Sequence, residues 1–167
     1  SLQLMDPKGA FSFVPDKNKQ RHIILFAAGS GITPLMSIAK SALFFESKTL
    51  VSLIYGNRHE GTVIFRKQLD ELKSRFSDRF NIVPVYSQPD KLWNGYKGRI
   101  DAVIAVNVLN LLPKLSPEQT FYYLCGPDGM MEEVKIGLKK LQVKLDHIHF
   151  ESFTSSNESE EALAGLG

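Results

Sequence analysis

Three short segments of this chain carry residue types suited to holding a phosphorylated ligand. The first is Gly29-Ser30-Gly31-Ile32-Thr33-Pro34, which follows an apolar run at residues 23–28. Thr33 is a good N-cap and Pro34 fits the first position of a helix, so the segment predicts a strand, a tight turn and a helix N-terminus. Glycines let a phosphate approach the backbone, and a helix N-terminus attracts anions. The segment therefore predicts a nucleotide-phosphate site. It departs from the G-x-G-x-x-G pattern, because Pro34 replaces the third glycine, and the alternative is an ordinary turn between a strand and a helix.

Two further segments have the same character and also follow apolar runs. Tyr55-Gly56-Asn57-Arg58 ends the run at residues 50–55, and Cys125-Gly126-Pro127-Asp128-Gly129 ends the run at residues 120–125. In an open α/β sheet, ligands bind beyond the carboxyl ends of the strands. We therefore expect the three segments to meet at one edge of a sheet. The alternative is that turns between strands and helices contain glycine for conformational reasons alone.

Composition limits the classes of function. The chain has 167 residues, of which 43% are hydrophobic, and its formal net charge is +2. That size suits one domain with a full core, and that charge gives no argument for nucleic acid or an anionic membrane as partner. We expect no membrane span and a cytoplasmic location, since no apolar run is long enough and no signal peptide is evident. The single cysteine, Cys125, excludes an internal disulfide and a Cys-ligated zinc or iron–sulfur site within these residues.

Apolar strand-like runs alternate with helical periodicity along most of the chain. Strands are predicted at residues 22–28, 50–55, 81–86, 120–125 and 147–153. Helices are predicted at residues 34–46, 63–76, 101–111 and 130–141, with a loop at 88–97. Strands that are apolar on both faces and alternate with helices predict a parallel sheet covered on both sides. The expected fold is a three-layer α/β sandwich with a doubly wound, five-stranded, Rossmann-like sheet.

The two ends of the chain differ in composition from its middle. Residues 1–20 contain Pro7, Gly9 and Pro15 and predict a lead-in segment with a turn. Residues 21–153 form the expected domain. Residues 154–167 are rich in Ser, Glu and Gly and predict a flexible linker. We expect the chain to be part of a longer polypeptide.

Four motifs in order give the chain a family resemblance: Ala28–Pro34, Tyr55–Arg58, Leu124–Pro127 and Phe150–Phe153. Together they resemble the ferredoxin–NADP⁺ reductase superfamily, and within it the oxygenase reductases and phenylacetate-pathway reductases. The resemblance implies an NAD(P)-binding domain that partners an FAD-binding β-barrel. Residues 4–11 are similar to the last strand and exit loop of such a barrel. In these relatives a tail like residues 154–167 leads to a plant-type [2Fe–2S] domain.

The resemblance also implies roles for individual residues. The turn at residues 29–34 would hold the cofactor diphosphate, with Thr33 on the nicotinamide side. Cys125 would help to position the nicotinamide ring over Gly126 and Pro127, although a buried cysteine is also a common small core residue. The other expected cofactor contacts are Gly56, Asn57, Arg58, Ser87, Asp128, Met130, Glu151 and Phe153. Phe153 could equally be a core residue.

Arg58 bears on the choice of dinucleotide. It follows the second predicted strand, where NAD-specific proteins usually place an acid for the ribose hydroxyls, and a cation there can accept the extra phosphate of NADPH. Glu60 lies close in sequence and weakens this inference. The expected cofactor is NADPH or NADH, with a lean to NADPH, and a solvated surface Arg58 is the alternative.

The expected activity is hydride transfer from NAD(P)H to FAD, followed by electron transfer to an iron–sulfur centre and an oxygenase component. The alternative is a non-catalytic nucleotide-binding module on the same fold. A Walker-type NTPase is excluded, because Thr62-Val63 stands where Lys-Ser/Thr is required. His147 and His149 would share a strand face, but no third metal ligand is evident.

Overall fold

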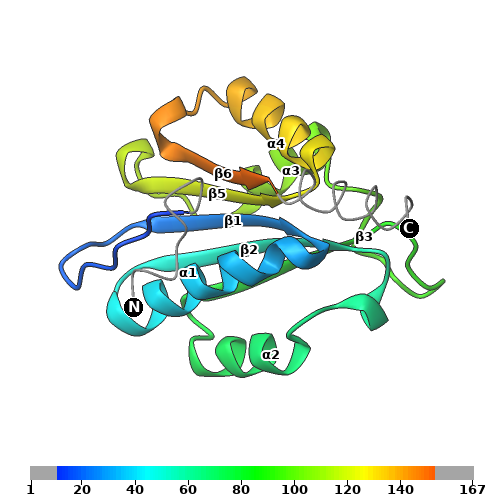
Figure 1. Ribbon diagram of the computed structural model, residues 1–167, viewed down its shortest axis with the longest axis horizontal. Coiled ribbons are helices and arrows are strands. Elements are labelled where there is room, and N and C mark those ends of the chain that lie inside the picture. Colours follow the sequence, from blue (N-terminus) through cyan, green and yellow to red (C-terminus); the bar gives the residue numbers. More distant parts are fainter. Residues whose placement is uncertain (1–10, 153–167) are drawn as a thin grey trace, which may run out of the picture.

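The computed structural model describes residues 11–152 and shows a parallel sheet between two helical layers (Figure 1). The strands are β1 (His22–Ala28), β2 (Leu50–Asn57), β3 (Phe80–Tyr86), β4 (Tyr96–Lys97), β5 (Thr120–Gly126) and β6 (Ile148–Ser152). The longer helices are α1 (Ile32–Phe45), α2 (Arg66–Arg75), α3 (Ala102–Leu111) and α4 (Asp128–Lys140). Short 3₁₀ turns are η2 (Gly29–Gly31), η3 (Glu60–Thr62), η4 (Pro117–Gln119) and η5 (Leu145–His147).

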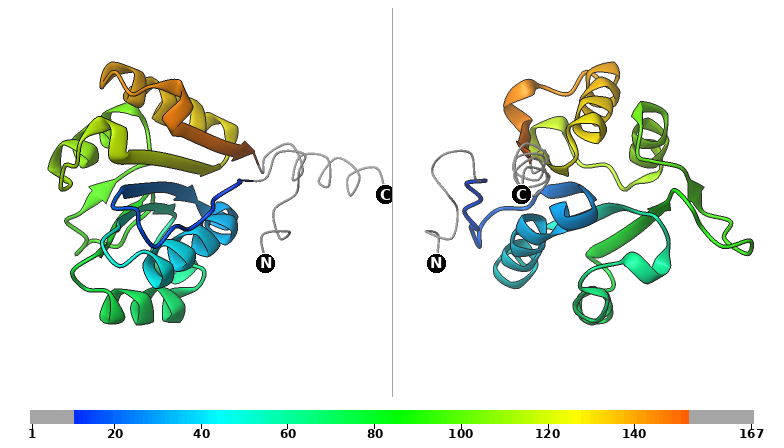
Figure 2. Two further views of the ribbon diagram at one scale, coloured as in Figure 1. Left: turned by 90° about the vertical axis from the view of Figure 1, so that its left-hand side faces the viewer. Right: turned by 45° about the vertical axis from the view of Figure 1, so that its right-hand side comes forward.

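The strand order places a topological switch point in the middle of the sheet. The six strands lie in the order β4-β3-β2-β1-β5-β6, and every neighbouring pair is parallel. The chain therefore winds from β1 toward β3 with α1 and α2 on one face, then crosses to β5 and β6 with α3 and α4 on the other (Figure 2). The doubly wound α/β fold expected from the sequence is confirmed, with the switch point between β1 and β5.

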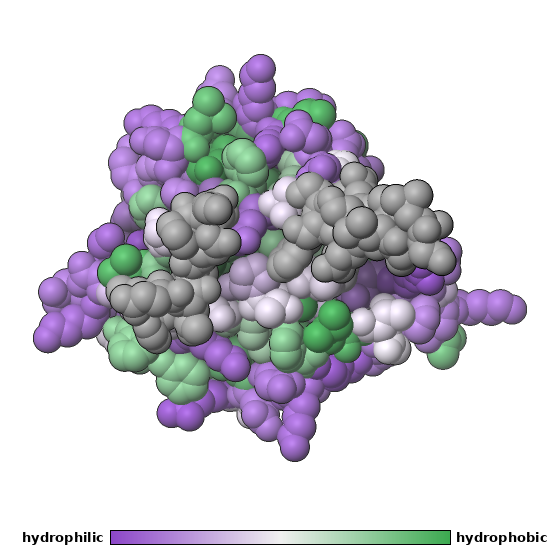
Figure 3. All heavy atoms as spheres, in the orientation of Figure 1, coloured by the Kyte–Doolittle hydropathy of each residue, from purple (hydrophilic) through white to green (hydrophobic). Residues whose placement is uncertain are grey.

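Each face of the sheet is covered by its own apolar core. Ile23, Leu25 and Leu53 pack under α1 and α2, whereas Ile24 and Phe26 pack under α3 and α4. Alternate residues of β1 thus enter opposite cores, which is why the strand is apolar throughout. On the face shown in Figure 3, hydrophilic residues dominate the margin of the molecule and hydrophobic ones form small separate areas.

The sheet has one strand more than the sequence predicted. The two residues of β4 lie inside the predicted loop 88–97 and pair with Val85 and Tyr86 of β3. The Trp93 indole N–H donates to the Tyr96 carbonyl at 2.9 Å, and the Trp93 ring packs against Tyr86 at 4.6 Å between centroids. These contacts fold the loop back along the sheet edge. A two-residue strand has no periodicity by which a sequence could reveal it.

Three helices begin two or more residues from their predicted starts. Helix α1 begins at Ile32 with Gly31 as its N-cap, because η2 leads directly into it, and so the expected capping by Thr33 is wrong. Helix α2 begins only at Arg66, because Phe65 takes a left-handed conformation with φ of 62°. Helix α4 begins at Asp128, two residues before the predicted start.

The lead-in segment contributes to the core, which its turn-like sequence did not predict. Phe11 and Phe13 are 3% and 6% exposed, and both pack edge-to-face on Tyr123 of β5. The Arg21 guanidinium lies over the Phe13 ring at 4.7 Å from its centroid. The described part of the lead-in is therefore fixed to the α1 face of the domain.

Candidate functional site

The strand register brings the three glycine-bearing segments to one edge of the sheet. Ala28 pairs with Gly56 of β2, and Ala27 pairs with Cys125 of β5. Because all the strands are parallel, the turns that follow β1, β2 and β5 leave the sheet at the same carboxyl edge. The turns after β1 and β5 flank the switch point, which is where open α/β sheets have their ligand crevice.

Gly31 packs directly against the backbone of the turn after β5. A Cβ added at Gly31 would lie 2.1 Å from the Cys125 carbonyl oxygen and 2.9 Å from the Gly126 nitrogen. Both neighbours are backbone atoms, so no side chain fits at this position. A Cβ at Gly126 would in turn lie 2.6 Å from Met130 Cε. The absence of a side chain at Gly31 is what lets the turns after β1 and β5 meet, and Gly126 leaves room for the Met130 side chain.

The N-terminus of α1 has the features of an anion site. No side chain caps this terminus, and its first turn contains no acidic residue. Gly29 has a φ of +55°, and a Cβ placed there would meet nothing within 4 Å. The backbone therefore presents an open, glycine-shaped surface beside the positive end of a 14-residue helix. These residues fit the diphosphate of a dinucleotide.

The N-terminus of α4 faces the same edge but is occupied by an acid. Asp128 lies in its first turn, and its carboxylate accepts a hydrogen bond from the Ser152 hydroxyl of β6. Pro127 is the N-cap and gives no side-chain bond. Because a carboxylate already lies against this helix dipole, the site favours phosphate at α1 rather than at α4.

Cys125 is buried in the core under α1 rather than displayed on the crevice. Its exposed fraction is 0%, and burial, together with the nearby Glu151 carboxylate, raises the pKa of its thiol to about 12. The thiol is therefore protonated at neutral pH and is a poor nucleophile. The expected positioning role of Cys125 stays a prediction.

Tyr55 is a site residue that the sequence motif contained but that its pattern did not single out. Its hydroxyl donates to the Gly29 carbonyl at 3.3 Å and accepts from the Ile64 N–H at 3.3 Å. Burial raises the pKa of this hydroxyl. Tyr55 thus joins the turn after β1 to the segment before α2. A tyrosine at the end of an otherwise aliphatic strand was the available signal, because its hydroxyl needs a partner when buried.

The turn after β2 is joined to the turn after β3 through the backbone. The Ser87 N–H donates to the Asn57 carbonyl at 3.0 Å, and the Gln88 N–H donates to the Arg58 carbonyl at 2.7 Å. Arg58 is exposed and forms no ion pair with another described residue. The Asn57 side-chain amide nitrogen is buried and has no partner among the described residues. Asn57, Arg58 and Ser87 therefore lie together at the β2 side of the edge, and their contact with a cofactor stays a prediction.

Glu60 does not stand unpaired near Arg58. Its carboxylate forms an ion pair with Arg66 at 2.6 Å, and Arg66 also lies 3.7 Å from Asp70. The negative charge of Glu60 is thus largely balanced by a different arginine. Arg58 keeps its charge available for an anion.

The remaining predicted site residues lie on or beyond the last strand. Glu151 pairs with Cys125 across β5 and β6 and is partly buried, while Phe153 falls outside the described residues. Within residues 11–152 no three His, Cys, Asp or Glu side chains are grouped to hold a metal. His147 and His149 instead stack on Phe121 and Tyr123. No helix in the described part of the chain is long and apolar enough to cross a membrane.

A family comparison agrees with this arrangement. Residues 25–135 match the family described as oxidoreductase NAD-binding domain, a range that runs from β1 into α4 and includes all three turns. The chain belongs to this family. It is thereby placed in the ferredoxin–NADP⁺ reductase superfamily, as the four sequence motifs indicated.

Individual relatives support the same placement. The chain is 32% identical over 159 residues to a 1,2-phenylacetyl-CoA epoxidase subunit of Escherichia coli, covering 93% of this chain and 43% of that protein. It is 35% identical over 134 residues to NADH-cytochrome b5 reductase 2 of Aspergillus terreus, covering 79% and 41%. Among solved structures, the CS-b5R domains of human Ncb5or in the NAD⁺ form match with a TM-score of 0.70 and 29% identity, covering 78% and 36%. The chain thus spans less than half the length of the curated relatives that it matches.

Proposed function

We propose that this chain is the NAD(P)H-binding part of a flavin-dependent oxidoreductase. The dinucleotide lies across the carboxyl edge at the switch point, with its diphosphate on the N-terminus of α1. The observation that carries the proposal is the backbone contact of Gly31 with Cys125 and Gly126, which brings the turns after β1 and β5 together beside an acid-free helix terminus. Membership of an NAD-binding family supports the ligand class.

In this proposal the flavin belongs to a separate barrel domain, and hydride passes from the nicotinamide to FAD. The contribution of this chain is geometric: it fixes the donor so that the reacting atoms meet in one orientation, which removes much of the entropic barrier. Electrons then pass to an iron–sulfur centre and onward to an oxygenase component. The similarity to a component of an epoxidase supports this last step, and the similarity to cytochrome b5 reductases supports an oxidoreductase in general.

The first test places a negative charge where the diphosphate is proposed to bind. Thr33→Glu adds a carboxylate to the first turn of α1, and we expect dinucleotide affinity to fall about fivefold or more, since charge at a helix N-terminus acts on the order of 1 kcal/mol. The matched control is Ser37→Glu, one turn further along the same exposed side. Titration calorimetry with NADH and NADPH measures both variants. Equal affinities for Thr33→Glu and the parent would exclude the helix terminus as the phosphate site.

The second test concerns the extra phosphate of NADPH. We propose that Arg58 holds this phosphate, because it is exposed and unpaired among the described residues while Glu60 is balanced by Arg66. Arg58→Gln should weaken NADPH binding by about tenfold, the size of a lost charge-assisted contact, and should leave NADH binding unchanged. Equal losses for both dinucleotides would argue for a general role of Arg58 instead.

The non-catalytic alternative makes a different prediction for the longer protein. With a flavin-bearing partner domain present, the reductase proposal expects NAD(P)H to bleach the visible absorbance of the oxidised flavin. Dinucleotide binding without any bleaching would favour a regulatory module.

A further inference from the structure

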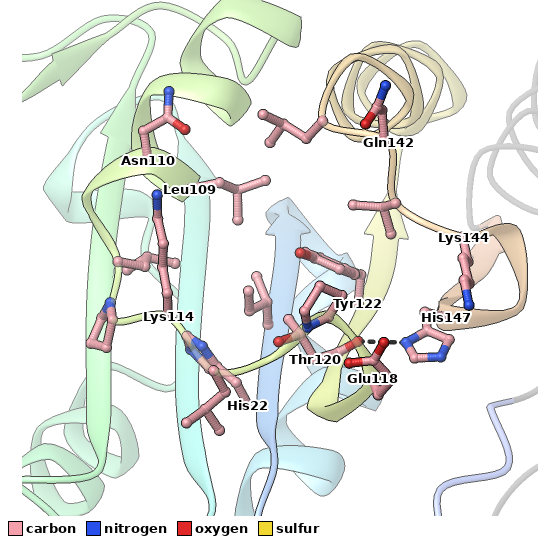
Figure 4. Close-up of a pocket in the computed structure, with 17 residues that line it drawn as sticks. His22, Leu109, Asn110, Lys114, Glu118, Thr120, Tyr122, Gln142, Lys144 and His147 are labelled. Atoms are coloured by element: carbon pink, nitrogen blue, oxygen red, sulfur yellow. Dashed lines mark hydrogen bonds between the residues drawn. The ribbon is translucent and has the colours of Figure 1, made fainter.

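A hollow lies at the edge of the sheet opposite the three glycine turns. It lies over the amino ends of β1 and β5, between the C-terminal ends of α3 and α4, and has a volume of about 280 Å³ (Figure 4). Because β1 and β5 run parallel, their amino and carboxyl ends are on opposite sides of the domain. The hollow is therefore separate from the dinucleotide crevice.

The interior of the hollow is mainly apolar, and a tyrosine hydroxyl reaches into it (Figure 4). Ile24, Leu109 and Val143 contribute aliphatic surface from β1, α3 and the turn after α4. Tyr122 projects from β5 into the space between the ends of the two helices (Figure 4). Its hydroxyl makes no hydrogen bond to another described residue. Such a combination of apolar walls with a few polar groups is typical of small-molecule sites.

The walls of the hollow are held in place by hydrogen bonds, so the site is preformed. The turn after α4 is a Schellman motif, in which the Gln142 N–H donates to the Lys139 carbonyl and the Val143 N–H donates to the Leu138 carbonyl, both at 3.0 Å. On the floor, the Nε2 atom of His22 lies 2.8 Å from the Ser52 hydroxyl.

The charged residues at the margin favour an anion. Lys114 and Lys144 lie on opposite sides of the hollow, and Glu118 is the one carboxylate among the residues that line it (Figure 4). The ring of His147 donates from Nδ1 to the Thr120 carbonyl at 2.8 Å, which fixes it at the lower margin. A molecule with an apolar body and a negative head group therefore finds complementary surface here.

We propose that this hollow is a ligand-binding site for a small aliphatic or aromatic carboxylate. The apolar body of the ligand lies against Ile24, Leu109 and Val143, where it displaces water from apolar surface. A carboxylate oxygen accepts a hydrogen bond from the Tyr122 hydroxyl, and Lys114 and Lys144 supply the attracting charge. The proposal does not depend on what binds at the carboxyl edge.

The test uses three probes with the same six-carbon chain and different head groups. Hexanoate, hexan-1-ol and hexylamine are each titrated into the ¹⁵N-labelled 167-residue chain and followed by two-dimensional NMR. We expect hexanoate to shift the amides around Leu109, Val143 and Tyr122, hexan-1-ol to bind more weakly and hexylamine not to bind. Benzoate should shift the same amides as hexanoate.

Variants of the chain test which residues contact the ligand. Tyr122→Phe should weaken hexanoate about fivefold, as expected for one lost hydrogen bond. Combined Lys114→Gln and Lys144→Gln should remove the preference for hexanoate over hexan-1-ol. Lys40→Gln, an exposed change on α1, is the matched charge control and should change nothing.

Three outcomes would overturn the proposal. They are the absence of shifts with hexanoate, equal binding of all three probes, and shifts confined to the amides around Gly29 and Ile32. The last result would mean that hexanoate is only an anion on the α1 terminus. A folded Tyr122→Phe variant that binds hexanoate with the affinity of the parent would contradict the proposed hydrogen bond from Tyr122.

Discussion

The two ends of helix α1 lie at opposite edges of the sheet and are finished in opposite ways. At its N-terminus, backbone packs on backbone, and no side chain caps the free amides. At and just beyond its C-terminus, a charged side chain binds several backbone carbonyls. Arg79 alone donates to the carbonyls of Leu43, Glu46 and Thr49 at 2.7–2.9 Å. The edge proposed to bind a ligand has no side-chain cap on α1, whereas at the opposite edge a charged side chain binds the backbone, and we refer to this opposite edge as the saturated edge.

The saturated edge is centred on a buried ion pair. Arg21 and Glu46 form a two-bonded contact at 3.0 and 2.6 Å, and their exposed fractions are 7% and 0%. The Thr49 hydroxyl and the Asp16 N–H also donate to the same carboxylate, at 2.7 and 3.0 Å. This network ties the lead-in, β1 and the end of α1 together. The two edges therefore differ in role. Side-chain bonds at the C-terminal end hold α1 in place, and the N-terminal end keeps backbone amides that no side chain caps.

The largest effect is expected from removing one partner of the buried pair. Glu46→Ala leaves the Arg21 guanidinium buried without a counter-charge, which costs about 3–5 kcal/mol in the free energy of unfolding. Urea denaturation followed by circular dichroism measures this loss. Glu71→Ala, an exposed carboxylate on α2, is the matched control and should stay within about 0.5 kcal/mol of the parent. If Glu46→Ala behaved like Glu71→Ala, the saturated edge would not be what fixes the helix.

A pH dependence is expected from the same edge. His22 is 1% exposed, and burial lowers its pKa to about 4, against which a hydrogen bond to the Pro113 carbonyl acts only partly. Because the unfolded chain binds a proton near pH 6.5 and the folded chain does not, stability is full above that pH. It should fall by about 2–3 kcal/mol as the pH is lowered from 6.5 to 4.

Urea titrations at several pH values between 6.5 and 4 measure this slope. His22→Gln should flatten it, while His59→Gln, an exposed substitution near η3, should keep the slope of the parent. Glu46 adds to the loss of stability only at the lower end of this pH range, because its pKa is lowered. Burial acts to raise that pKa, but the hydrogen bonds from Arg21, Thr49 and Asp16 outweigh it. An unchanged slope in His22→Gln would assign the pH dependence to other groups.

Much of the fold could be predicted from the sequence, because its signals are local. The long strands are built around apolar runs such as Ile23–Ala27, and the helices show a repeated apolar face. The buried Arg21–Glu46 pair could not be predicted, because the two residues are 25 positions apart. Arginine and glutamate are also residue types that usually lie at the protein surface. The burial of Phe11 and Phe13 was missed for a similar reason: their partner, Tyr123, is remote in the sequence.

For the site, the sequence predicted which turns meet but not how they fit. Parallel topology alone brings the turns after β1, β2 and β5 to one edge, so glycine at strand ends was a sufficient signal. The burial of the Cys125 thiol depends on which face of β5 it occupies, and a strand that is apolar on both faces gives no such information. The ion pair of Glu60 with Arg66 depends on the turn at η3, which lies before the predicted helix at residues 63–76 and was not predicted.

The smallest effects on stability are expected from alanine substitutions at two glycines of the open edge. Gly31→Ala should destabilise the protein by about 1–3 kcal/mol, because the added Cβ meets the backbone of Cys125 and Gly126 and one turn must shift. Gly129→Ala, in the first turn of α4, meets nothing within 4 Å and should instead stabilise by about 0.4–1 kcal/mol. Thermal unfolding of the two variants and the parent measures both signs.

Opposite signs in these two variants would show that the open edge has been shaped by packing and not by a general need for flexibility. Both glycines lie in turns or first helical turns at the same edge, so flexibility alone predicts that each alanine costs a similar amount. Titration with a dinucleotide measures how each of the two substitutions affects binding. Gly31→Ala should lose binding because the crevice is displaced, whereas Gly129→Ala should keep it. A stable Gly31→Ala variant that binds normally would mean that the turns after β1 and β5 need not touch for the site to form.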